Sequence, residues 1–479
     1  MAKHVHLSGI CGTAMASLAG LLREKGCRVT GSDAAAYPPM SDQLHAMGIP
    51  VAQPYAEANL DELPDLVVIG NALSRGNPEV ERILDERIPF TSMAAALHEE
   101  FLTGRESLVV AGTHGKTTTT SMLAWIYQTA SQDDPAMEPS FLIGGVAENF
   151  GTSYQLRSTR TFILEGDEYD TAFFDKGPKF LHYFPDGLIL TSVEFDHADI
   201  YADLAQVKIA FQRLVNLVPR RGVIVAYDGS AHVSECVSKA LCRVERYGFT
   251  EAADWRIANL RFEDGRSRWE VHHNGEMWAQ LEMRIAGEHN VLNATAAAAL
   301  AANQGLPVAA IQAALESFLS VKRRLEVRAV IDGVTIIDDF AHHPTAIRET
   351  LRALRQAYPN AGRLWAVLEP RSNTLRRNVF EHELVSSLAL ADRVILAAVY
   401  QQQRIPEPER LHPEQVIATL HAVGTSAELC ADVAAIVDTL DAQLRPGDVV
   451  AILSNGGFDG IYEKLPARLA QRTGSLARA

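Results

Sequence analysis

The sequence lacks the long apolar runs that would place it in a membrane. No uninterrupted apolar segment approaches the roughly 20 residues of a transmembrane helix. The opening stretch, "MAKHVHLSGICG", runs directly into a strand-and-glycine pattern and lacks the apolar core of a secretory signal. These absences predict a cytoplasmic protein with no membrane partner.

Cysteine is scarce, and its spacing fits no metal or disulfide framework. The five cysteines are odd in number and show no C-x-x-C pair. We therefore expect buried free thiols. The cysteines are Cys11, Cys27, Cys236, Cys242 and Cys430.

Positive charge is in deficit, with a formal net charge of −15. Long-range repulsion then opposes general binding to nucleic acid, so no nucleic-acid partner is expected, and an anionic substrate must be bound at a local basic site. The 47 % hydrophobic and 22 % charged residues are ordinary for folded proteins, and 479 residues favour about three domains.

Strand-like apolar runs alternate with helix-length segments, which favours parallel α/β architecture. The chain divides into three blocks, at residues 1–105, 106–320 and 321–479. In the second block, Asp264-Gly265 and Asn274-Gly275 between alternating segments predict β-hairpin turns. In the third block, four strands are expected at "VTIID", "RLWAVLEP", "DRVILAAV" and "DVVAILS". The connector "SFLSVKRRLEVRAVIDG" is expected to separate the last two blocks.

The stretch Val109–Met122, "VVAGTHGKTTTTSM", nearly matches a phosphate-binding loop. The usual spacing is G-x-x-x-x-G-K-[ST], yet Val110 stands where the first glycine belongs. A strand ending at Ala111 and a helix from about Lys116 would direct backbone N–H groups at a phosphate, with Lys116 on the β/γ-phosphates and the Thr117 hydroxyl on Mg²⁺. A glycine-containing turn capped by threonine is the alternative.

The displaced position of the first glycine is also found in a known family. "GTHGKTTT" resembles the ATP-binding signature of the Mur ligase family, in which the first glycine is displaced as Gly112 is here. The resemblance implies an ATP-dependent enzyme that joins a carboxylate to an amine. It also implies three α/β domains, of which the first and third are Rossmann-like and the central one is a P-loop ATPase. The implied ATP-binding residues of this loop are Gly112, Thr113, His114, Gly115, Lys116, Thr117 and Thr118.

Two strand ends carry candidate Mg²⁺ ligands. In "TFILEGDEYD", Glu165 matches the first acid of the family's acidic cluster, and hard Mg²⁺ prefers oxygen ligands. A solvated acidic turn is the alternative for its neighbours Asp167, Glu168 and Asp170. In "GLILTSVEFDHADIY", the resemblance implies that His197 helps to hold a second Mg²⁺, although a lone histidine is more often structural.

One position departs from several family members. Their carbamoylated lysine lies 14 or 15 residues beyond that histidine, where this chain has Phe211 and Gln212. The chain therefore resembles the branch that acts on the muramate carboxylate. Lys208 lies nearby, but nothing assigns it the missing role.

Two further segments resemble nucleotide-contacting parts of the family. "GEHNVLNATAAAA" resembles the adenine-contacting segment, which implies roles for His289 and Asn293; capping of the following helix is the alternative for an asparagine. "VKRRLE" resembles the junction where an arginine approaches ATP. The sequence does not separate Arg323 from Arg324, of which we expect Arg324 in this role, and a basic surface hinge is the alternative.

"IIDDFAHHPTAI" resembles a family stretch at a strand end of the third domain. The resemblance implies that Asp339 and His342 participate in closing that domain over ATP, with Asp339 among the ATP-binding residues.

Near the N-terminus, "SGICGTAM" is an imperfect G-x-G-x-x-G, and Asp33 ends the next predicted strand. Read alone, this pattern suggests a dinucleotide with Asp33 on a ribose, or only packing glycines in a βαβ turn. The family resemblance implies a UDP-sugar instead, with its diphosphate on the glycine loop, its uridine side near Asp33, and its sugar near "NALSRGNPEV". The implied residues are Gly9, Gly12, Thr13, Asp33 and Ser74.

The resemblance implies that ATP phosphorylates the lactyl carboxylate of UDP-N-acetylmuramate and that an amine then attacks the acyl phosphate, with Lys116 and His197 as catalytic residues. Two amines are used in this branch, free L-alanine and the tripeptide L-alanyl-γ-D-glutamyl-meso-diaminopimelate of cell-wall recycling. "LEPRSNTLRRN", "ILSNGGFDGIYEKL" and the insert "FFDKGPKFLHYFPD" resemble the tripeptide members. We expect Arg371 and Asn455 to bind the peptide.

Several alternatives stay open at this point. Arg376 and Arg377 are further candidates for the peptide carboxylates, since arginine forks suit them, and an exposed basic helix start is the alternative for all three arginines. An L-alanine ligase and a catalytically silent UDP-sugar sensor are the competing functions. Retention of Lys116, Thr117 and the Mg²⁺ candidates counts against the sensor. The oligomeric state is not predicted.

Overall fold

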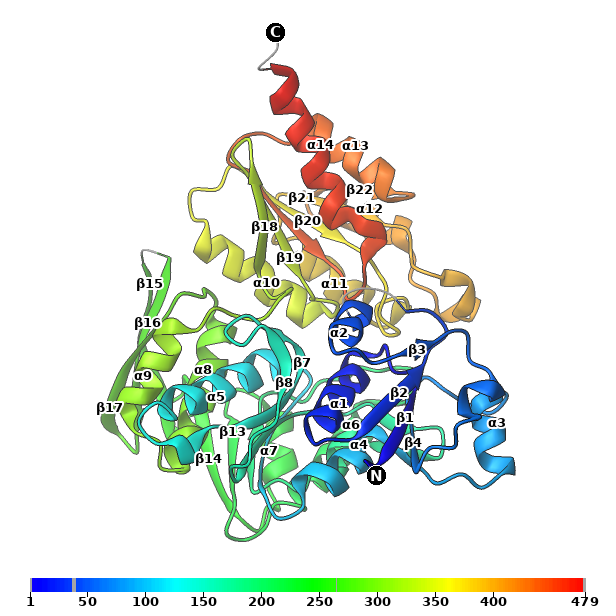
Figure 1. Ribbon diagram of the computed structural model, residues 1–479. Helices are drawn as coiled ribbons and strands as arrows, with labels where there is room; N and C mark the ends of the chain where they lie inside the picture. The colour runs from blue at the N-terminus through cyan, green and yellow to red at the C-terminus, as the bar shows by residue number, and fades with distance from the viewer. Residues whose placement is uncertain (1, 37–39, 264, 477–479) are drawn as a thin grey trace.

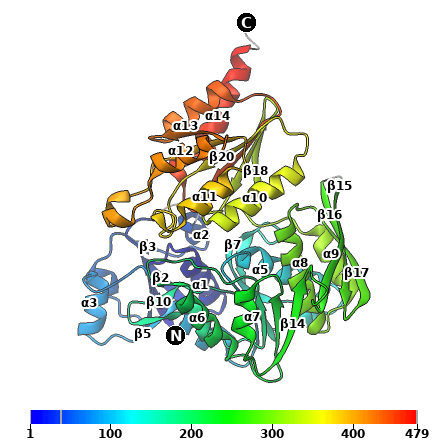
Figure 2. The ribbon, with the colours of Figure 1, turned by 180° about the vertical axis from the view of Figure 1, so that it is seen from behind.

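The computed structural model describes residues 2–36, 40–263 and 265–476, which form three α/β units, each built on its own main sheet (Figure 1). The C-terminal unit, yellow to red, lies above the N-terminal and central units, and the view from behind shows the same arrangement (Figure 2). None of the helices in these ranges is long and apolar enough to cross a membrane.

The N-terminal unit has a five-stranded parallel sheet in the order β3-β2-β1-β4-β5. Its strands are β1 (His4–Ser8), β2 (Arg28–Ser32), β3 (Val51–Ala52), β4 (Leu66–Ile69) and β5 (Phe90–Ser92). Its helices are α1 (Thr13–Glu24), α2 (Met40–Ala46), α3 (Pro78–Asp85) and α4 (Met93–Leu97), the last continued by a π-helical turn at His98–Leu102.

The central unit has a ten-stranded sheet in the order β17-β16-β15-β14-β13-β12-β6-β9-β7-β8. Its strands are β6 (Glu106–Ala111), β7 (Ser140–Ala147), β8 (Thr152–Gln155), β9 (Thr161–Gly166), β12 (Gly187–Leu190), β13 (Val223–Tyr227), β14 (Arg243–Gly248), β15 (Trp255–Glu263), β16 (Arg266–His273) and β17 (Glu276–Met283). A separate hairpin joins β10 (Asp170–Ala172) to β11 (Asp175–Pro178). The helices are α5 (Lys116–Ala130), α6 (Leu204–Val215), α7 (Ala231–Val237), α8 (Glu288–Asn303) and α9 (Val308–Ser317).

The C-terminal unit has a six-stranded sheet in the order β18-β19-β23-β20-β21-β22. Its strands are β18 (Glu326–Ile331), β19 (Val334–Asp339), β20 (Leu364–Leu368), β21 (Arg393–Ala397), β22 (Ser426–Cys430) and β23 (Val449–Leu453). Its helices are α10 (Pro344–Ala357), α11 (Glu381–Leu388), α12 (Pro413–Ala422), α13 (Val433–Gln443) and α14 (Ile461–Leu476).

The predicted α/β class is confirmed, and so is the hairpin at Asn274-Gly275, which joins antiparallel β16 and β17. The other predicted turn includes Asp264, which lies outside the described residues. All four strands expected in the third block exist as β19, β20, β21 and β23. The connector prediction was wrong in one respect, because its "EVRAVI" part forms the antiparallel edge strand β18. β18 and β22, both at sheet edges, lack the continuous apolar run of a buried strand.

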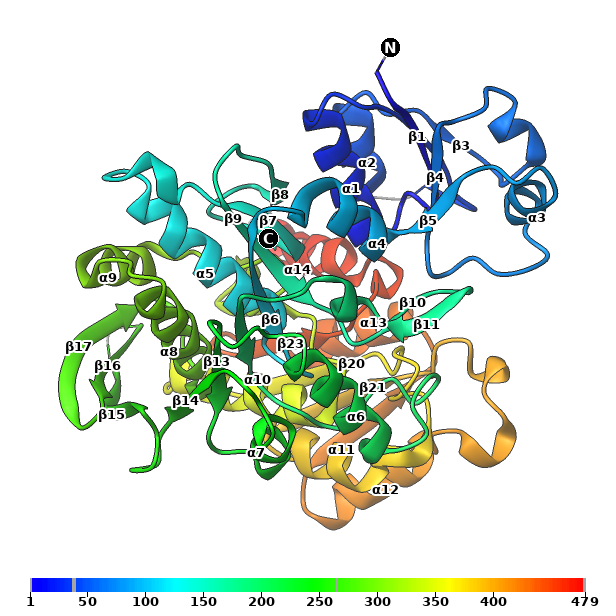
Figure 3. The same ribbon diagram turned by 90° about the horizontal axis from the view of Figure 1, so that it is seen from below.

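The two faces of the central sheet are covered differently. Side chains of α5, α8 and α9 share one apolar core with alternate strand residues such as Leu108, Val110 and Ile189. The opposite strand residues, such as Val109 and Leu190, share another core with α6, α7 and the N-terminal unit (Figure 3). The N-terminal unit therefore completes a hydrophobic core of the central one.

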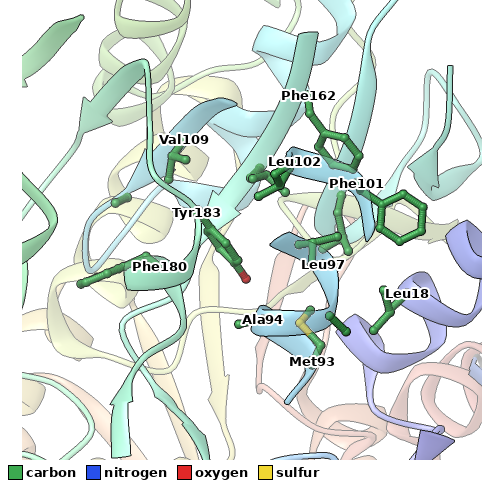
Figure 4. Close-up of a cluster of buried hydrophobic side chains, with 14 of the residues drawn as sticks. Leu18, Met93, Ala94, Leu97, Phe101, Leu102, Val109, Phe162, Phe180 and Tyr183 are labelled. Atoms are coloured by element: carbon green, nitrogen blue, oxygen red, sulfur yellow. The ribbon is translucent and has the colours of Figure 1, made fainter. Parts of the chain in front are cut away.

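The shared core is dense where the two units meet. Figure 4 shows Leu18, Met93 and Leu97 of the N-terminal unit near Phe162 and Tyr183 of the central unit. Phe101, on the connecting turn, has its ring centroid 6.4 Å from that of Phe162. On α1, a Cβ at Gly20 would lie 2.2 Å from the ring of Tyr154, so glycine is needed for this close approach. The five cysteines are free as expected, but only Cys11, Cys236 and Cys430 are buried, whereas Cys27 and Cys242 are partly exposed.

Candidate active site

The nucleotide loop has the predicted local structure, with β6 ending at Ala111 and α5 beginning at Lys116. Gly115 precedes the helix at φ +80°, and Gly112 has φ +135°, so both occupy conformations that L side chains rarely adopt. A Cβ at Gly112 would also lie 2.1 Å from Oγ1 of Thr191. The displaced glycine is therefore required by the approach of the loop following β12.

Lys116 lies folded against the loop that precedes it. Its ammonium donates to the Gly112 carbonyl at 2.7 Å and to the buried carboxylate of Glu168 at 2.8 Å. Burial alone would lower the pKa of Lys116, but the carboxylates of Glu168 and Asp167 raise it, so the ammonium stays charged. Glu168, one of the acids that also fit a solvated turn, is in fact 2 % exposed and pairs with the candidate catalytic lysine.

Two groups of side chains around the Lys116 ammonium have the chemistry of metal ligands. Thr117 donates its hydroxyl to Glu165 at 3.0 Å, and Glu165 also accepts the Gly144 N–H at 2.8 Å. Burial raises the pKa of Glu165 although Lys116 opposes this, which marks an undercompensated carboxylate that suits a cation. Asp167, Glu168 and His197 form the second group, with ligand atoms within 4.8 Å of one another.

His197 is engaged as a hydrogen-bond partner within that group. Its Nε2 lies 3.3 Å from Oε1 of Glu168. Burial opposes the charged ring, but Glu168 more than offsets this and raises the pKa of His197 to about 9. To bind a metal ion through Nε2, the His197 ring would therefore first have to lose the proton on that nitrogen.

A cavity of about 630 Å³ opens beside the loop, between the central and C-terminal units. Its walls contain eight of the expected ATP-binding residues, while Gly112, Thr113 and Lys116 lie outside its lining. The eight are His114, Gly115, Thr117, Thr118, His289, Asn293, Arg324 and Asp339. Among the described residues no hydrogen-bond partner is found for the buried Nδ1 of His289, which leaves a polar atom for a ligand.

The structure separates the two junction arginines. Arg324 lines the cavity and lies 3.4 Å from the Thr117 hydroxyl. Arg323 points into the C-terminal unit, where it donates to the carbonyls of Ser454 and Gly456 at 2.7 and 2.9 Å. Arg324 is therefore the arginine that faces the nucleotide loop.

The two residues expected to close the third domain have local partners. Asp339 is 5 % exposed and accepts the N–H groups of Leu325 and Ala341 at 2.8 and 2.9 Å, so its carboxylate holds the chain at the cavity wall. His342 hydrogen-bonds the Phe340 carbonyl at 2.8 Å, and burial lowers the pKa of its ring.

The start of α8 near His289 rules out the alternative that an asparagine of this segment caps the helix. Gly287 is the N-cap of α8, so neither asparagine of the segment caps it. Asn290 instead donates to the Ala286 carbonyl at 2.8 Å, and the side-chain oxygen of Asn293 lies 2.6 Å from a Cβ built on Gly115. The Asn293 side chain thus leaves no room for a Cβ at position 115, so only glycine fits there.

The glycine loop of the N-terminal unit follows β1. Gly9 has φ +86°, Gly12 precedes α1, and Thr13 is the first residue of that helix. Asp33 accepts the Cys11 N–H at 2.9 Å, so the Asp33 carboxylate is part of the loop's own framework. Ser74 lies exposed beyond β4.

A residue that sequence reasoning missed ties these segments together. Glu79, fully buried on α3, accepts the hydroxyls of Ser8 and Ser32 at 2.6 Å each and the Asn59 amide at 2.7 Å. Burial opposes its charge, but these donors and His6 lower the pKa of Glu79 to about 2. The ionised carboxylate therefore joins the ends of β1 and β2 to α3.

In the C-terminal unit, Arg371 lies beside the glycine-rich loop after β23. Its guanidinium stacks 3.9 Å from the Tyr400 ring centroid, and a Cβ at Gly456 would lie 2.1 Å from its Nε. In the neighbouring Asn455, the buried Oδ1 has no hydrogen-bond partner in the described parts of the chain. The two expected peptide-binding residues thus lie at one loop.

The other two arginines of that segment are used internally. Arg376 is buried and bonds Asn373, and Arg377 pairs with Glu409. Arg371 also has an internal partner, because it donates to Glu369 at 3.4 Å, but its side chain is 29 % exposed beside the glycine-rich loop. Lys208 pairs with Glu235 at 2.7 Å, in keeping with its having no assigned role.

Together, the lysine at a helix start, the acid–threonine pair and the hollow between two α/β units define a nucleotide site. Comparison with known proteins identifies its class. Residues 4–103 match the Mur ligase family catalytic domain, residues 110–301 the Mur ligase middle domain, and residues 323–456 the Mur ligase glutamate ligase domain. The chain belongs to the Mur ligase family and is an ATP-dependent ligase.

Individual relatives narrow the comparison. The chain is 42 % identical, over 98 % of both chains, to UDP-N-acetylmuramate–L-alanyl-γ-D-glutamyl-meso-2,6-diaminoheptandioate ligase of Escherichia coli (strain K12). It is 34 % identical to UDP-N-acetylmuramate–L-alanine ligase of Acidothermus cellulolyticus, over 94 % of this chain and 92 % of that one. The crystal structure of a murein peptide ligase from Psychrobacter arcticus 273-4 has 36 % identity and a TM-score of 0.73, covering 98 % of this chain and 99 % of that one.

Proposed function

We propose that this protein joins the lactyl carboxylate of UDP-N-acetylmuramate to the amine of L-alanyl-γ-D-glutamyl-meso-diaminopimelate, with ATP as co-substrate, in cell-wall peptide recycling. The observation that carries the reaction type is the charged Lys116 at the start of α5, beside the Thr117–Glu165 pair. The higher identity to the tripeptide ligase than to the alanine ligase, 42 % against 34 %, supports the amine.

The chain's residues account for activation of the carboxylate. Backbone N–H groups of the loop and of the start of α5 bind the phosphates, and Lys116 stabilises the charge on the transferring phosphoryl group. Thr117 and Glu165 would hold one Mg²⁺ and His197 would help to hold a second; when bound, Mg²⁺ supplies further positive charge there. The carboxylate attacks the γ-phosphorus, which yields ADP and an acyl phosphate.

The amine then attacks the acyl carbon, and phosphate leaves as the amide forms. Arg371 and Asn455 would position the peptide, since a guanidinium fork suits carboxylates and the Asn455 oxygen is without a partner in the described chain. Gly9, Gly12, Thr13, Asp33 and Ser74 would hold the UDP-sugar. A ligase that consumes ATP also supports a cytoplasmic location.

The ligase assignment is tested first by replacing the phosphate-binding lysine. Lys116→Ala should lower ADP formation about a hundredfold or more, as expected when a cation that stabilises the phosphoryl group is removed. Lys208→Ala, which removes a lysine paired with Glu235 outside the cavity, is the control and should retain activity. If the unaltered protein bound UDP-N-acetylmuramate but formed no ADP with either amine, it would be a UDP-sugar sensor.

The amine is tested by assaying both candidates side by side. With UDP-N-acetylmuramate and ATP, the tripeptide should support much faster phosphate release than L-alanine at equal concentration. Arg371→Ala should raise KM for the tripeptide more than KM for UDP-N-acetylmuramate. Arg377→Ala is the matched control, because that side chain pairs with Glu409. A clear preference for L-alanine would identify the biosynthetic ligase instead.

A further inference from the structure

Two histidines and a glutamate converge where the central and C-terminal units meet. His114 is on the nucleotide loop, Glu194 follows β12, and His343 precedes α10. Nε2 of His114 lies 3.4 Å and Nδ1 of His343 lies 3.9 Å from Oε2 of Glu194. The three ligand atoms all lie within 4.8 Å of one another, the spacing of donors around one metal ion. The group shares no residue with Thr117, Glu165 or His197.

Each side chain of the group is anchored through its own backbone. Glu194 donates its N–H to the Thr113 hydroxyl at 2.8 Å, and His114 donates its N–H to the Ser192 hydroxyl at 2.9 Å. These two bonds fix one side of the group to the central unit. On the other side, the His343 carbonyl accepts the Ile347 N–H of α10 at 2.9 Å, which fixes His343 to the C-terminal unit.

The orientation of His343 is that of a metal-binding histidine. Its Nε2–H donates to the Phe195 carbonyl at 3.2 Å, which leaves the lone pair on Nδ1, the nitrogen nearer Glu194. A second hydrogen bond of this kind is what normally orients a ligating imidazole. Burial lowers the pKa of His343 to about 4, so the ring is neutral and can donate its lone pair. A metal ion would replace the 3.2 Å bond that Nδ1 accepts from the Thr345 N–H.

We propose that His114, Glu194 and His343 form a binding site for Zn²⁺ or a similar transition-metal ion, which links the central unit to the C-terminal unit. Two imidazoles and one carboxylate are a ligand set that Zn²⁺ accepts with tetrahedral geometry, and Mg²⁺ prefers oxygen ligands alone. The Glu194 side chain is 35 % exposed, and both Glu194 and His114 line the cavity, so water can supply the fourth ligand. The site does not depend on which amine the enzyme uses.

The test uses Co²⁺ as a coloured substitute for Zn²⁺ and the full chain without nucleotide or Mg²⁺. Titration with Co²⁺ should produce the intense visible bands of a tetrahedral site at one equivalent. Zn²⁺ should then remove these bands, because it binds such sites more tightly than Co²⁺. Zn²⁺ should also raise the melting temperature, since it binds only the folded chain at this site.

Three variants locate the ion. His114→Ala and His343→Asn should abolish the bands and the rise in melting temperature, and the asparagine preserves a side-chain acceptor for the first turn of α10. Glu165→Gln should retain the bands, because Glu165 belongs to a different candidate metal group, with Thr117. Absence of tetrahedral bands from the unaltered protein would overturn the proposal, as would bands that survive in His343→Asn or disappear in Glu165→Gln.

Discussion

The central unit meets its two neighbours through contrasting junctions. Toward the N-terminal unit the contact is a continuous apolar core, in which Leu18 and Leu97 face Phe162 and Tyr183 (Figure 4). Toward the C-terminal unit the direct contacts include several side-chain hydrogen bonds, one of which, between Thr345 and Glu194, lies in the wall of the 630 Å³ cavity. These bonds join Thr374 to Asp196 at 2.6 Å, Thr345 to Glu194 at 2.7 Å and Asn373 to Asp199 at 2.7 Å.

The two junctions differ in how easily they can open. Separating the apolar junction exposes hydrocarbon to water at about 25 cal/mol per Å², whereas hydrogen bonds of the polar junction can be exchanged for bonds to water at small net cost. The contrast predicts that the N-terminal and central units move as one body and that the C-terminal unit moves against them. Such an opening would admit ligands to the cavity.

The largest expected effect is at the apolar junction. Phe162→Ala removes a fully buried ring that packs beside Phe101, so the free energy of unfolding should fall by about 3–5 kcal/mol. Urea denaturation followed by tryptophan fluorescence measures this. Leu241→Ala is the control, because Leu241 is 75 % exposed and its truncation should change stability by less than about 0.5 kcal/mol. If Phe162→Ala lowered the free energy of unfolding as little as the control does, the apolar junction would contribute little to stability.

Acid should weaken the polar junction. The pKa of His343 is lowered by burial from 6.5 to about 4, so between these values the unfolded chain binds a proton that the folded chain does not. Stability is therefore lost as the pH falls through this window, by roughly 3 kcal/mol for this group at 1.36 kcal/mol per pKa unit. Glu194, whose pKa hydrogen bonds lower to about 2 against the effect of burial, loses its contribution below about pH 4.5.

Denaturation of the unaltered protein and of His343→Asn at a series of pH values between 7 and 4 measures this effect. The variant should show a smaller loss of stability on acidification, since its asparagine takes up no proton. The Phe162→Ala variant should keep the pH dependence of the unaltered protein, because Phe162 lies in the apolar core and His343 lies at the polar junction. Parallel curves for all three proteins would show that His343 does not cause the acid sensitivity.

Much of this fold follows from local sequence pattern. Strands that are buried on both faces, such as β6 and β23, are continuous apolar runs and were predicted. The edge strand β18 has an alternately exposed sequence and was placed in a connector. β18 pairs with the next strand, β19, across the Asp332-Gly333 turn, and the register shifts between Val327 and Ala329, so no continuous apolar run marks β18 in the sequence.

The site residues likewise divide into those that local sequence pattern predicts and those that it does not. The nucleotide loop was identified from spacing, since its glycines and lysine act within a few residues of each other. Arg323 and Arg324 could not be separated, because their divergence depends on the left-handed backbone of Arg323, at φ 62°. Glu79 and Glu194 were missed because their partners lie far away in the chain, as Ser8 does from Glu79.

The smallest expected effect is at a single hydrogen bond of the polar junction. Thr374 is 2 % exposed and donates its hydroxyl to Asp196 at 2.6 Å, while the same oxygen accepts the Ala198 N–H at 3.3 Å. In Thr374→Ala the Asp196 carboxylate retains the His197 N–H, so the loss should be about 1 to 2 kcal/mol. Because this bond links two units, the loss should appear as faster hydrogen exchange at the facing segments, with little change in the exchange of the N-terminal unit. Thr419→Ala, an exposed threonine on α12 that bonds only within its own helix in the described structure, is the matched control. Uniformly faster exchange in all three units would mean that the polar junction opens only on global unfolding, and the contrast between the two junctions would then be one of chemistry without a difference in mobility.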